Sequence, residues 1–90
     1  MAVVKIPPVL RSATNGEKEI SASGSNVGDV LRSVVESFPE TERQLFGQDG
    51  GLNRYVNVYL NDEDVRVLEG LDTAVEDADT IMILPAMAGG

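Results

Sequence analysis

Side chains that could do chemistry are scarce in this sequence of 90 residues, which contains neither cysteine nor histidine. This composition excludes a thiol nucleophile, a disulfide and a histidine-based catalytic triad, and it removes the usual ligands of zinc and iron–sulfur sites. Acid–base chemistry would fall to carboxylates, two lysines and two tyrosines. We therefore expect no catalytic side-chain site, and a protein that is not itself an enzyme.

The densest group of carboxylates is the run Asp62, Glu63 and Asp64. Carboxylate oxygens are the ligands that hard cations such as Ca²⁺ prefer. Three acidic residues in a turn between strands are, however, more often a solvated corner of the surface than a metal site. We expect neither a metal site nor a bound cofactor.

The remaining candidate group is the α-carboxylate behind Gly89 and Gly90. Glycine has no Cβ, so an extended segment from Pro85 to Gly90 would be slender enough to enter a narrow channel in another protein. It would reach roughly 20 Å at about 3.3 Å per residue. A carboxylate is ionised at neutral pH and is a poor electrophile, so a partner must activate it. An acyl adenylate made from ATP is the simplest form of that activation.

One amphipathic helix is predicted over residues 25–38. Asn26 can cap its first turn, Asp29 suits the positive end of the helix dipole, and Pro39 ends it. Apolar residues recur there at helical spacing: Val27, Val30, Leu31, Val34, Val35 and Phe38. This stripe indicates a helix that packs one face against a core.

Alternating and β-branched residues predict strands at 3–6, 17–23, 54–61, 65–68 and 80–84. Asn15 and Gly16 are typical of a tight hairpin turn between the first two strands, and Pro85 is expected to end the last strand. Because a single helix cannot cover both faces of a sheet, the sequence predicts a two-layer α+β domain over residues 1–84. Residues 85–90 would then form a flexible tail.

The last strand predicts a surface for a partner. Its side chains alternate between faces, so Ile81 and Ile83 are expected to face the helix. The residues left on the open face form a predicted docking patch: Met82, Leu84, Tyr59 and Tyr55. The alternative is that aromatic and aliphatic residues stand there only because they suit strands. We favour docking, because the tail leaves from the same strand.

The net charge of −8 comes from 15 acidic and 7 basic residues. Such a charge repels nucleic-acid phosphates and anionic lipid, so neither nucleic acid nor a membrane is an expected partner. It favours docking to a basic protein surface, with Asp62–Asp64 and Glu76–Asp79 steering the encounter; the alternative is that charge only keeps the chain soluble. Because no apolar run approaches 18 residues and no signal-peptide pattern is present, we expect a cytoplasmic protein.

Three stretches carry a resemblance to a known family: "EISASG" before the helix, "RYVNVYLNDEDVR" at 54–66, and "TIMILPAMAGG" at 80–90. The chain resembles, over essentially its whole length, the ubiquitin-like sulfur carriers of the ThiS/MoaD family. Within that family it is most similar to the CysO-type carriers of bacterial cysteine biosynthesis. The resemblance implies a β-grasp, or ubiquitin-like, roll with a mixed sheet of about four to five strands and one main helix.

The resemblance also implies a chemistry for the C-terminus. In this family an E1-like enzyme uses ATP to adenylate the terminal glycine, here Gly90, and transfer from a sulfur donor gives a thiocarboxylate. Gly89 would be the required spacer. Ala86 and Ala88 would form a slender neck, in which Met87 is the bulky member that affects the fit to partners. In the CysO type the acceptor is an activated serine on a PLP-dependent cysteine synthase, and a JAMM-type metallopeptidase releases the product.

Other functions stay open at this point. The same carrier chemistry could serve thiamin, molybdopterin or a specialised sulfur metabolite. The same terminus could instead form isopeptide bonds, as in a ubiquitin-like protein modifier. A structural subunit with an inert tail is a third alternative.

Overall fold

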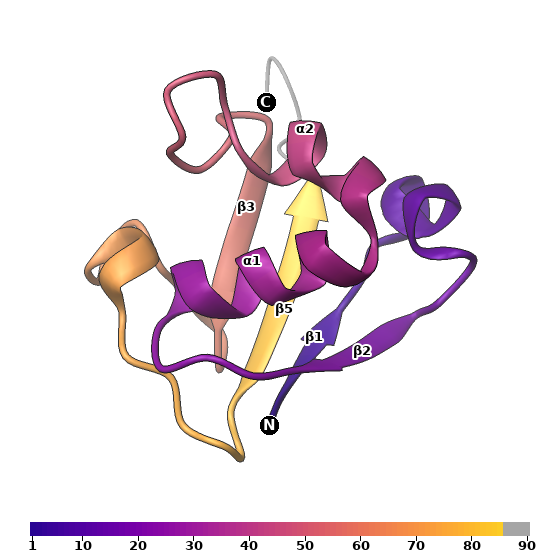
Figure 1. Ribbon diagram of the computed structural model, residues 1–90. Helices are drawn as coiled ribbons and strands as arrows, with labels where there is room; N and C mark the ends of the chain where they lie inside the picture. The colour runs from indigo at the N-terminus through magenta and orange to yellow at the C-terminus, as the bar shows by residue number, and fades with distance from the viewer. Residues whose placement is uncertain (86–90) are drawn as a thin grey trace.

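The strands form one mixed sheet in the computed structural model, which describes residues 1–85 (Figure 1). The strands are β1 (Ala2–Lys5), β2 (Glu19–Ala22), β3 (Val56–Leu60), β4 (Glu63–Asp64) and β5 (Thr80–Pro85). Their order across the sheet is β2-β1-β5-β3-β4. β1 and β5 are parallel, and the other neighbouring strands are antiparallel. The strand that leads to the predicted tail is therefore central, with a hydrogen-bonded neighbour on each side.

Helix α1 (Val27–Ser37) crosses one face of this sheet (Figure 1). The shorter helices are η1 (Pro8–Thr14), η2 (Pro39–Thr41), α2 (Glu42–Leu45) and η3 (Gly70–Asp72), of which all but α2 are 3₁₀ helices. On the opposite face of the sheet, side chains such as Lys5 and Leu84 are exposed to solvent. The two-layer α+β arrangement predicted from the sequence is confirmed.

The start of α1 is fixed by local interactions. Asn26 has extended backbone, and its Oδ1 accepts the Asp29 N–H at 2.7 Å, as a capping residue does. Just before it the chain passes so close to the helix that a Cβ at Gly24 would lie 2.6 Å from the Val30 nitrogen. Only glycine fits at that position without moving the first turn of the helix.

The core forms where the strand alternation meets the helical stripe. Its fully buried members from the strands are Val4, Val58, Ile81 and Ile83, and those from α1 are Val27, Val30, Leu31 and Val34. Burying a side chain of this size contributes roughly 1.5–3 kcal/mol to stability. Packing of this kind holds a valine-rich helix whose intrinsic helix propensity is modest.

The strand predicted at 65–68 is wrong. The chain pairs with β3 two residues earlier, through β4, and then enters consecutive turns. The Val67 N–H donates to the Asp64 carbonyl and the Leu68 N–H donates to the Val65 carbonyl, each at 3.0 Å. Val65 is fully buried, whereas Val67 is 81% exposed. A single inward valine anchors the turn, so the β-branched residues there do not mark a strand.

The hairpin predicted between the first two strands is confirmed, since β1 and β2 pair antiparallel, but Asn15 and Gly16 do not form a tight turn between them. Helix η1 lies between the two strands, and Pro8 stands at its first position, where a missing N–H costs nothing. Asn15 (φ 55°) and Gly16 (φ 83°) take left-handed conformations that end this helix. The Gly16 N–H returns to the Arg11 carbonyl at 2.7 Å. The two residues therefore form a helix terminus.

Candidate functional site

The outer face of the sheet, opposite α1, carries the side chains predicted for it from strand alternation. Tyr59 lies directly opposite Met82 in the β3–β5 ladder, and both are half-buried. Asn57 lies opposite Leu84, which is 39% exposed. Lys5 flanks Met82 from the parallel strand β1. The predicted orientation of these residues is confirmed, and their role in docking stays a prediction.

The fourth residue of the predicted patch, Tyr55, lies where β3 begins. It is 63% exposed, and the Arg54 guanidinium stands over its ring at 5.9 Å. The next residue, Val56, pairs with Pro85, which is the last residue described. β5 therefore extends one residue past the predicted end at Leu84, and Tyr55 lies beside the point where the chain leaves the sheet.

The residues predicted to carry the chemistry lie outside the described part of the chain: Ala86, Met87, Ala88, Gly89 and Gly90. The structure fixes the strand from which they continue. β5 is central in the strand order, and its first residues, Thr80–Met82, have β1 as a neighbour, whereas its last residue, Pro85, is paired with Val56 of β3. The predicted tail therefore continues from the middle of the sheet rather than from an edge.

Arg66 belongs to the same surface, and sequence reasoning missed it. Its Nη1 donates to the Asn57 Oδ1 and its Nη2 donates to the Asn53 carbonyl, both at 3.0 Å. The guanidinium thus reaches from the turn after β4 to the residues that begin β3. Arg66 and Asn57 are nine positions apart in the sequence. Only the register of the β3–β4 hairpin brings them together, and no pattern in the sequence signals it.

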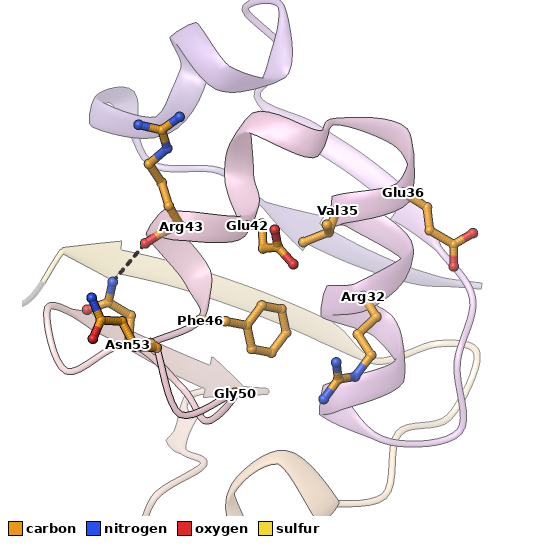
Figure 2. A pocket seen from close by; sticks show the side chains of 10 residues that line it. Arg32, Val35, Glu36, Glu42, Arg43, Phe46, Gly50 and Asn53 are labelled. Atoms are coloured by element: carbon orange, nitrogen blue, oxygen red, sulfur yellow. Dashed lines mark hydrogen bonds between the residues drawn. The ribbon is translucent and has the colours of Figure 1, made fainter.

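A hollow of about 690 Å³ lies on the helical side, between the second half of α1 and the loop after α2 (Figure 2). The Arg32 guanidinium covers the Phe46 ring at 5.1 Å, and Figure 2 shows Arg43 directed away from that ring. Asn53 donates from its side chain to the Arg43 carbonyl at 3.1 Å and so holds the loop to α2. Glu36 and Glu42 line the hollow together with the two arginines, so its walls carry no single sign of charge.

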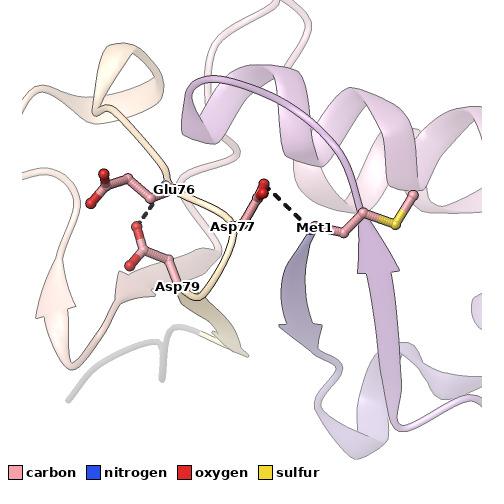
Figure 3. A network of polar contacts seen from close by, with 4 residues as sticks. All are labelled: Met1, Glu76, Asp77 and Asp79. Atoms are coloured by element: carbon pink, nitrogen blue, oxygen red, sulfur yellow. Dashed lines mark hydrogen bonds and ion pairs between the residues drawn. The ribbon is translucent and has the colours of Figure 1, made fainter.

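The loop before β5 gathers acidic residues (Figure 3). Asp77 pairs with the Met1 amino group at 3.4 Å. Asp79 accepts the Glu76 backbone N–H at 2.8 Å and the Asn61 side-chain amide at 2.9 Å. The hydrogen bond from Glu76, and then the one from Asn61, hold the pKa of Asp79 below its usual value because both favour the ionised form.

The steering role of these acids stays a prediction, and the structure shows where they lie relative to the tail. Glu76–Asp79 directly precede the first residue of β5, and the Asn61 N–H bonds to the carbonyl of that residue, Thr80, at 2.9 Å. The chain leaves the sheet at the other end of the strand, after Pro85 (Figure 1). The acidic loop and the predicted tail are thus at opposite ends of the sheet.

Within residues 1–85, no group of three or more histidine, cysteine, aspartate or glutamate side chains could hold a metal ion. In the acidic run of 62–64, the Asp64 Oδ1 accepts the backbone N–H of Arg66 at 2.9 Å. No helix in this described part of the chain is both long and apolar enough to cross a membrane.

The comparison with known sequences places the chain in a family. A model described as "ThiS family" matches residues 4–90. The sulfur carrier protein CysO of Mycobacterium tuberculosis is 45% identical over 89 residues, which cover 97% of this chain and 96% of that protein.

Solved structures of related proteins support the same family assignment. A chain in the crystal structure of the Amycolatopsis orientalis BexX/CysO complex matches with a TM-score of 0.91 and 42% identity, over 100% of each chain. Small archaeal modifier protein 1 from Methanosarcina acetivorans matches with a TM-score of 0.87 and 35% identity, over 99% of this chain and 95% of that one. The implied β-grasp fold is confirmed by these relatives, and the chain belongs to the ThiS family, in which it is similar to sulfur carriers of the CysO type.

Proposed function

We propose that this protein is a sulfur carrier whose functional group is the C-terminal carboxylate of Gly90. An E1-like enzyme adenylates that carboxylate with ATP, and transfer from a sulfur donor converts it to a thiocarboxylate. One observation carries the proposal: the similarity to sulfur carriers runs through the domain and the tail, with the family match reaching residue 90. The need for ATP and enzyme partners suits a cytoplasmic setting.

The order of the sheet supports this use of the tail. The strand before the tail is central, and its pairing with β3 continues as far as Pro85, so the domain anchors the point from which the residues beyond it would enter a partner. Gly89 and Gly90 present no side chain to the walls of a channel. In this proposal the neck formed by Ala86, Met87 and Ala88 sets how closely a partner encloses the tail.

The outer-face patch is the surface on which we expect the partner to dock. Met82 and Tyr59 provide apolar area at its centre, and Leu84 and Tyr55 extend it toward the tail. An apolar centre within a polar rim is typical of interfaces between proteins that associate and separate. A partner that covers this patch also receives the tail, because both belong to β5 and its neighbour.

The acceptor that we favour is an activated serine on a PLP-dependent cysteine synthase. The thiocarboxylate sulfur would form the new bond to the serine Cβ while the activating group leaves with its electron pair. A metallopeptidase of the JAMM type would then hydrolyse the cysteinyl adduct from the carrier. This proposal rests on the similarity to proteins named CysO. A thiamin, molybdopterin or specialised sulfur pathway is the alternative for the same carrier chemistry.

The direct test is intact-mass spectrometry after incubation with an E1-like enzyme, ATP and sulfide. Conversion to the thiocarboxylate makes the chain roughly 16 Da heavier, because sulfur replaces oxygen. A chain that lacks Gly90 is the matched control and should keep its original mass. If the truncated chain reacts as well as the full chain, the C-terminal carboxylate is not the functional group.

A second function is favoured by one relative, the small archaeal modifier protein 1 at 35% identity. A protein modifier would form isopeptide bonds between Gly90 and lysines of other proteins. With a cell lysate added to the same reaction, this function gives a ladder of conjugates on a gel. The carrier function gives the heavier mass and no ladder.

A further inference from the structure

The arginines of this acidic chain have a common feature: within residues 1–85, no carboxylate neutralises their charge by a close ion pair. Among residues 1–85, the one ion pair with nitrogen and oxygen within 4.0 Å joins the Met1 amino group to Asp77. None of the five arginines has a carboxylate of a described residue at that distance, although the chain has 15 acidic residues. Their positive charge is therefore available to groups outside the molecule.

Arg66 is held in place without being neutralised. Both of its acceptors, the Asn57 side-chain oxygen and the Asn53 carbonyl, are uncharged. Asn57 lies opposite Leu84, so the guanidinium is fixed on the outer face beside the predicted docking patch. A guanidinium has five N–H donors, and two are used here, so three remain for a partner.

Arg54 lies on the same side of the tail exit. It is exposed and stands over the ring of Tyr55, one residue before Val56, whose partner in the ladder is Pro85. The aromatic ring restricts the guanidinium without consuming its charge. Two arginines thus lie near the end of β5, on the side of β3. Hydrogen bonds fix Arg66, and an aromatic ring restricts Arg54.

Many of the negative charges lie in the segment of residues 62–79, which is strongly acidic. Residues 62–79 hold eight carboxylates and one base: Asp62, Glu63, Asp64, Glu69, Asp72, Glu76, Asp77, Asp79 and Arg66. The loop that ends this segment lies at the other end of β5 from Pro85 (Figure 1). A partner with negative charge would be repelled by that end and attracted to the arginines at the tail exit. The charge distribution therefore orients the carrier with its tail toward the partner.

We infer that Arg54 and Arg66 bind carboxylates on the rim of the partner's channel that receives the tail. The inference rests on the proposed function, in which a partner encloses the tail. Phosphates of the bound nucleotide are the other anions that arginine could meet. The nucleotide reacts at Gly90, however, and a tail extended into the channel would place it roughly 17 Å beyond Pro85. That distance is too great for side chains at the start of β3, so a protein carboxylate is the fitting partner.

The test uses the E1-like enzyme of the mass-spectrometry experiment and measures ATP–pyrophosphate exchange as the carrier concentration is varied. The variants are Arg54→Gln, Arg66→Gln and the two combined. Lys18→Gln is the matched control, because it removes the same unit charge from an exposed residue just before the edge strand β2, which β1 separates from β5 and which lies on the opposite side of β5 from β3. The double variant should raise the KM for the carrier about 5- to 20-fold, since each exposed charge pair changes affinity several-fold. The kcat, the KM for ATP and the control should be unchanged.

Two further measurements separate a binding role from a structural one. The KM of the wild-type carrier should rise with salt, and the double variant should lose most of that dependence. Arg66→Gln also removes two hydrogen bonds, so its melting temperature is compared with the wild type. Arg54 makes no such bonds among the described residues, and Arg54→Gln should raise the KM in a fold that is intact.

The results of these experiments distinguish a failure of the inference from a failure of the proposed function. Wild-type exchange with an unchanged KM in the double variant overturns the inference and leaves the proposed function standing. A raised KM for ATP in place of that for the carrier also overturns it, because the arginines would then act on the nucleotide. Absence of exchange with the wild-type chain contradicts the proposed function and the inference together.

Discussion

Tyr59 on β3 and Met82 on β5 lie directly opposite each other on the face of the sheet that α1 does not cover. The residue before Met82, Ile81, points the other way and is fully buried. Two adjacent residues of one strand thus belong to different parts of the molecule, the surface and the core. This relationship gives a clean comparison of docking and folding.

Met82→Ala should weaken binding to the E1-like enzyme while changing the free energy of unfolding by less than about 1 kcal/mol, because the side chain is only half-buried. Ile81→Ala should do the reverse and cost roughly 2–5 kcal/mol of stability. Urea unfolding and a binding titration measure the two effects. An unaltered affinity in a folded Met82→Ala protein would remove this residue from the docking patch.

Asn61→Gly should destabilise the domain by roughly 1–2 kcal/mol, because it removes two side-chain hydrogen bonds of ordinary strength. The Asn61 side chain accepts the Thr80 N–H at 3.0 Å and donates to Asp79 at 2.9 Å, so it ties the β3–β4 turn to the start of β5. Asp62→Gly is the control at the next position, where φ is 75° and glycine relieves strain. Chemical denaturation should show a loss for the first variant and none for the second.

Gly24→Ala should destabilise the domain by about 1–3 kcal/mol, the usual cost of forcing extra atoms into a packed site. Its Cβ would meet the Val30 nitrogen at 2.6 Å and the Asp29 Cβ at 2.8 Å. The first turn of α1 would have to shift. Gly47→Ala is the control, since its nearest neighbour is the movable Asp49 side chain at 3.2 Å. Equal melting temperatures for the two variants would show that α1 does not need this close approach.

Asp79→Asn should change how stability depends on pH. The hydrogen bonds from Glu76 and Asn61 lower the folded-state pKa of Asp79 below 3.8, so its ionised form favours the folded state. That contribution is complete above the unfolded-state pKa and is lost as pH falls through the folded-state pKa. The melting temperatures of wild type and variant should therefore differ at neutral pH and converge in acid. Curves that stay parallel throughout acidification would contradict this role, with Glu17→Gln as the control for a simple change of charge.

The sequence predicted those parts of the fold that are encoded by periodic side chains. Inward valines and isoleucines alternate along β3 and β5, and the apolar stripe on α1 marks its buried face. These two patterns were enough to predict the two layers and the residues that face each other between them. The orientation of Met82 and Leu84 came from the same alternation. The family resemblance then placed these elements in one topology.

The errors arose where local turns compete with strand propensity. Val65 and Val67 are β-formers, yet hydrogen bonds between close neighbours in the chain make a turn of that segment. Contacts between residues far apart in the sequence could not be predicted from its pattern either. The bond between Arg66 and Asn57 depends on the hairpin register, and the separation of the acidic loop from the tail exit depends on the direction of β5. Counting charges cannot supply either fact.

The central position of β5 has a mechanical consequence. The hydrogen bonds to β1 and β3 run across the strand, so a pull along β5 from its last residue, Pro85, loads them in shear and together rather than one after another. A strand at the edge would be bonded on one side and would yield to a smaller force. An enzyme that unfolds this chain by pulling on its C-terminus would therefore meet its greatest mechanical resistance at β5, the first strand that it reaches.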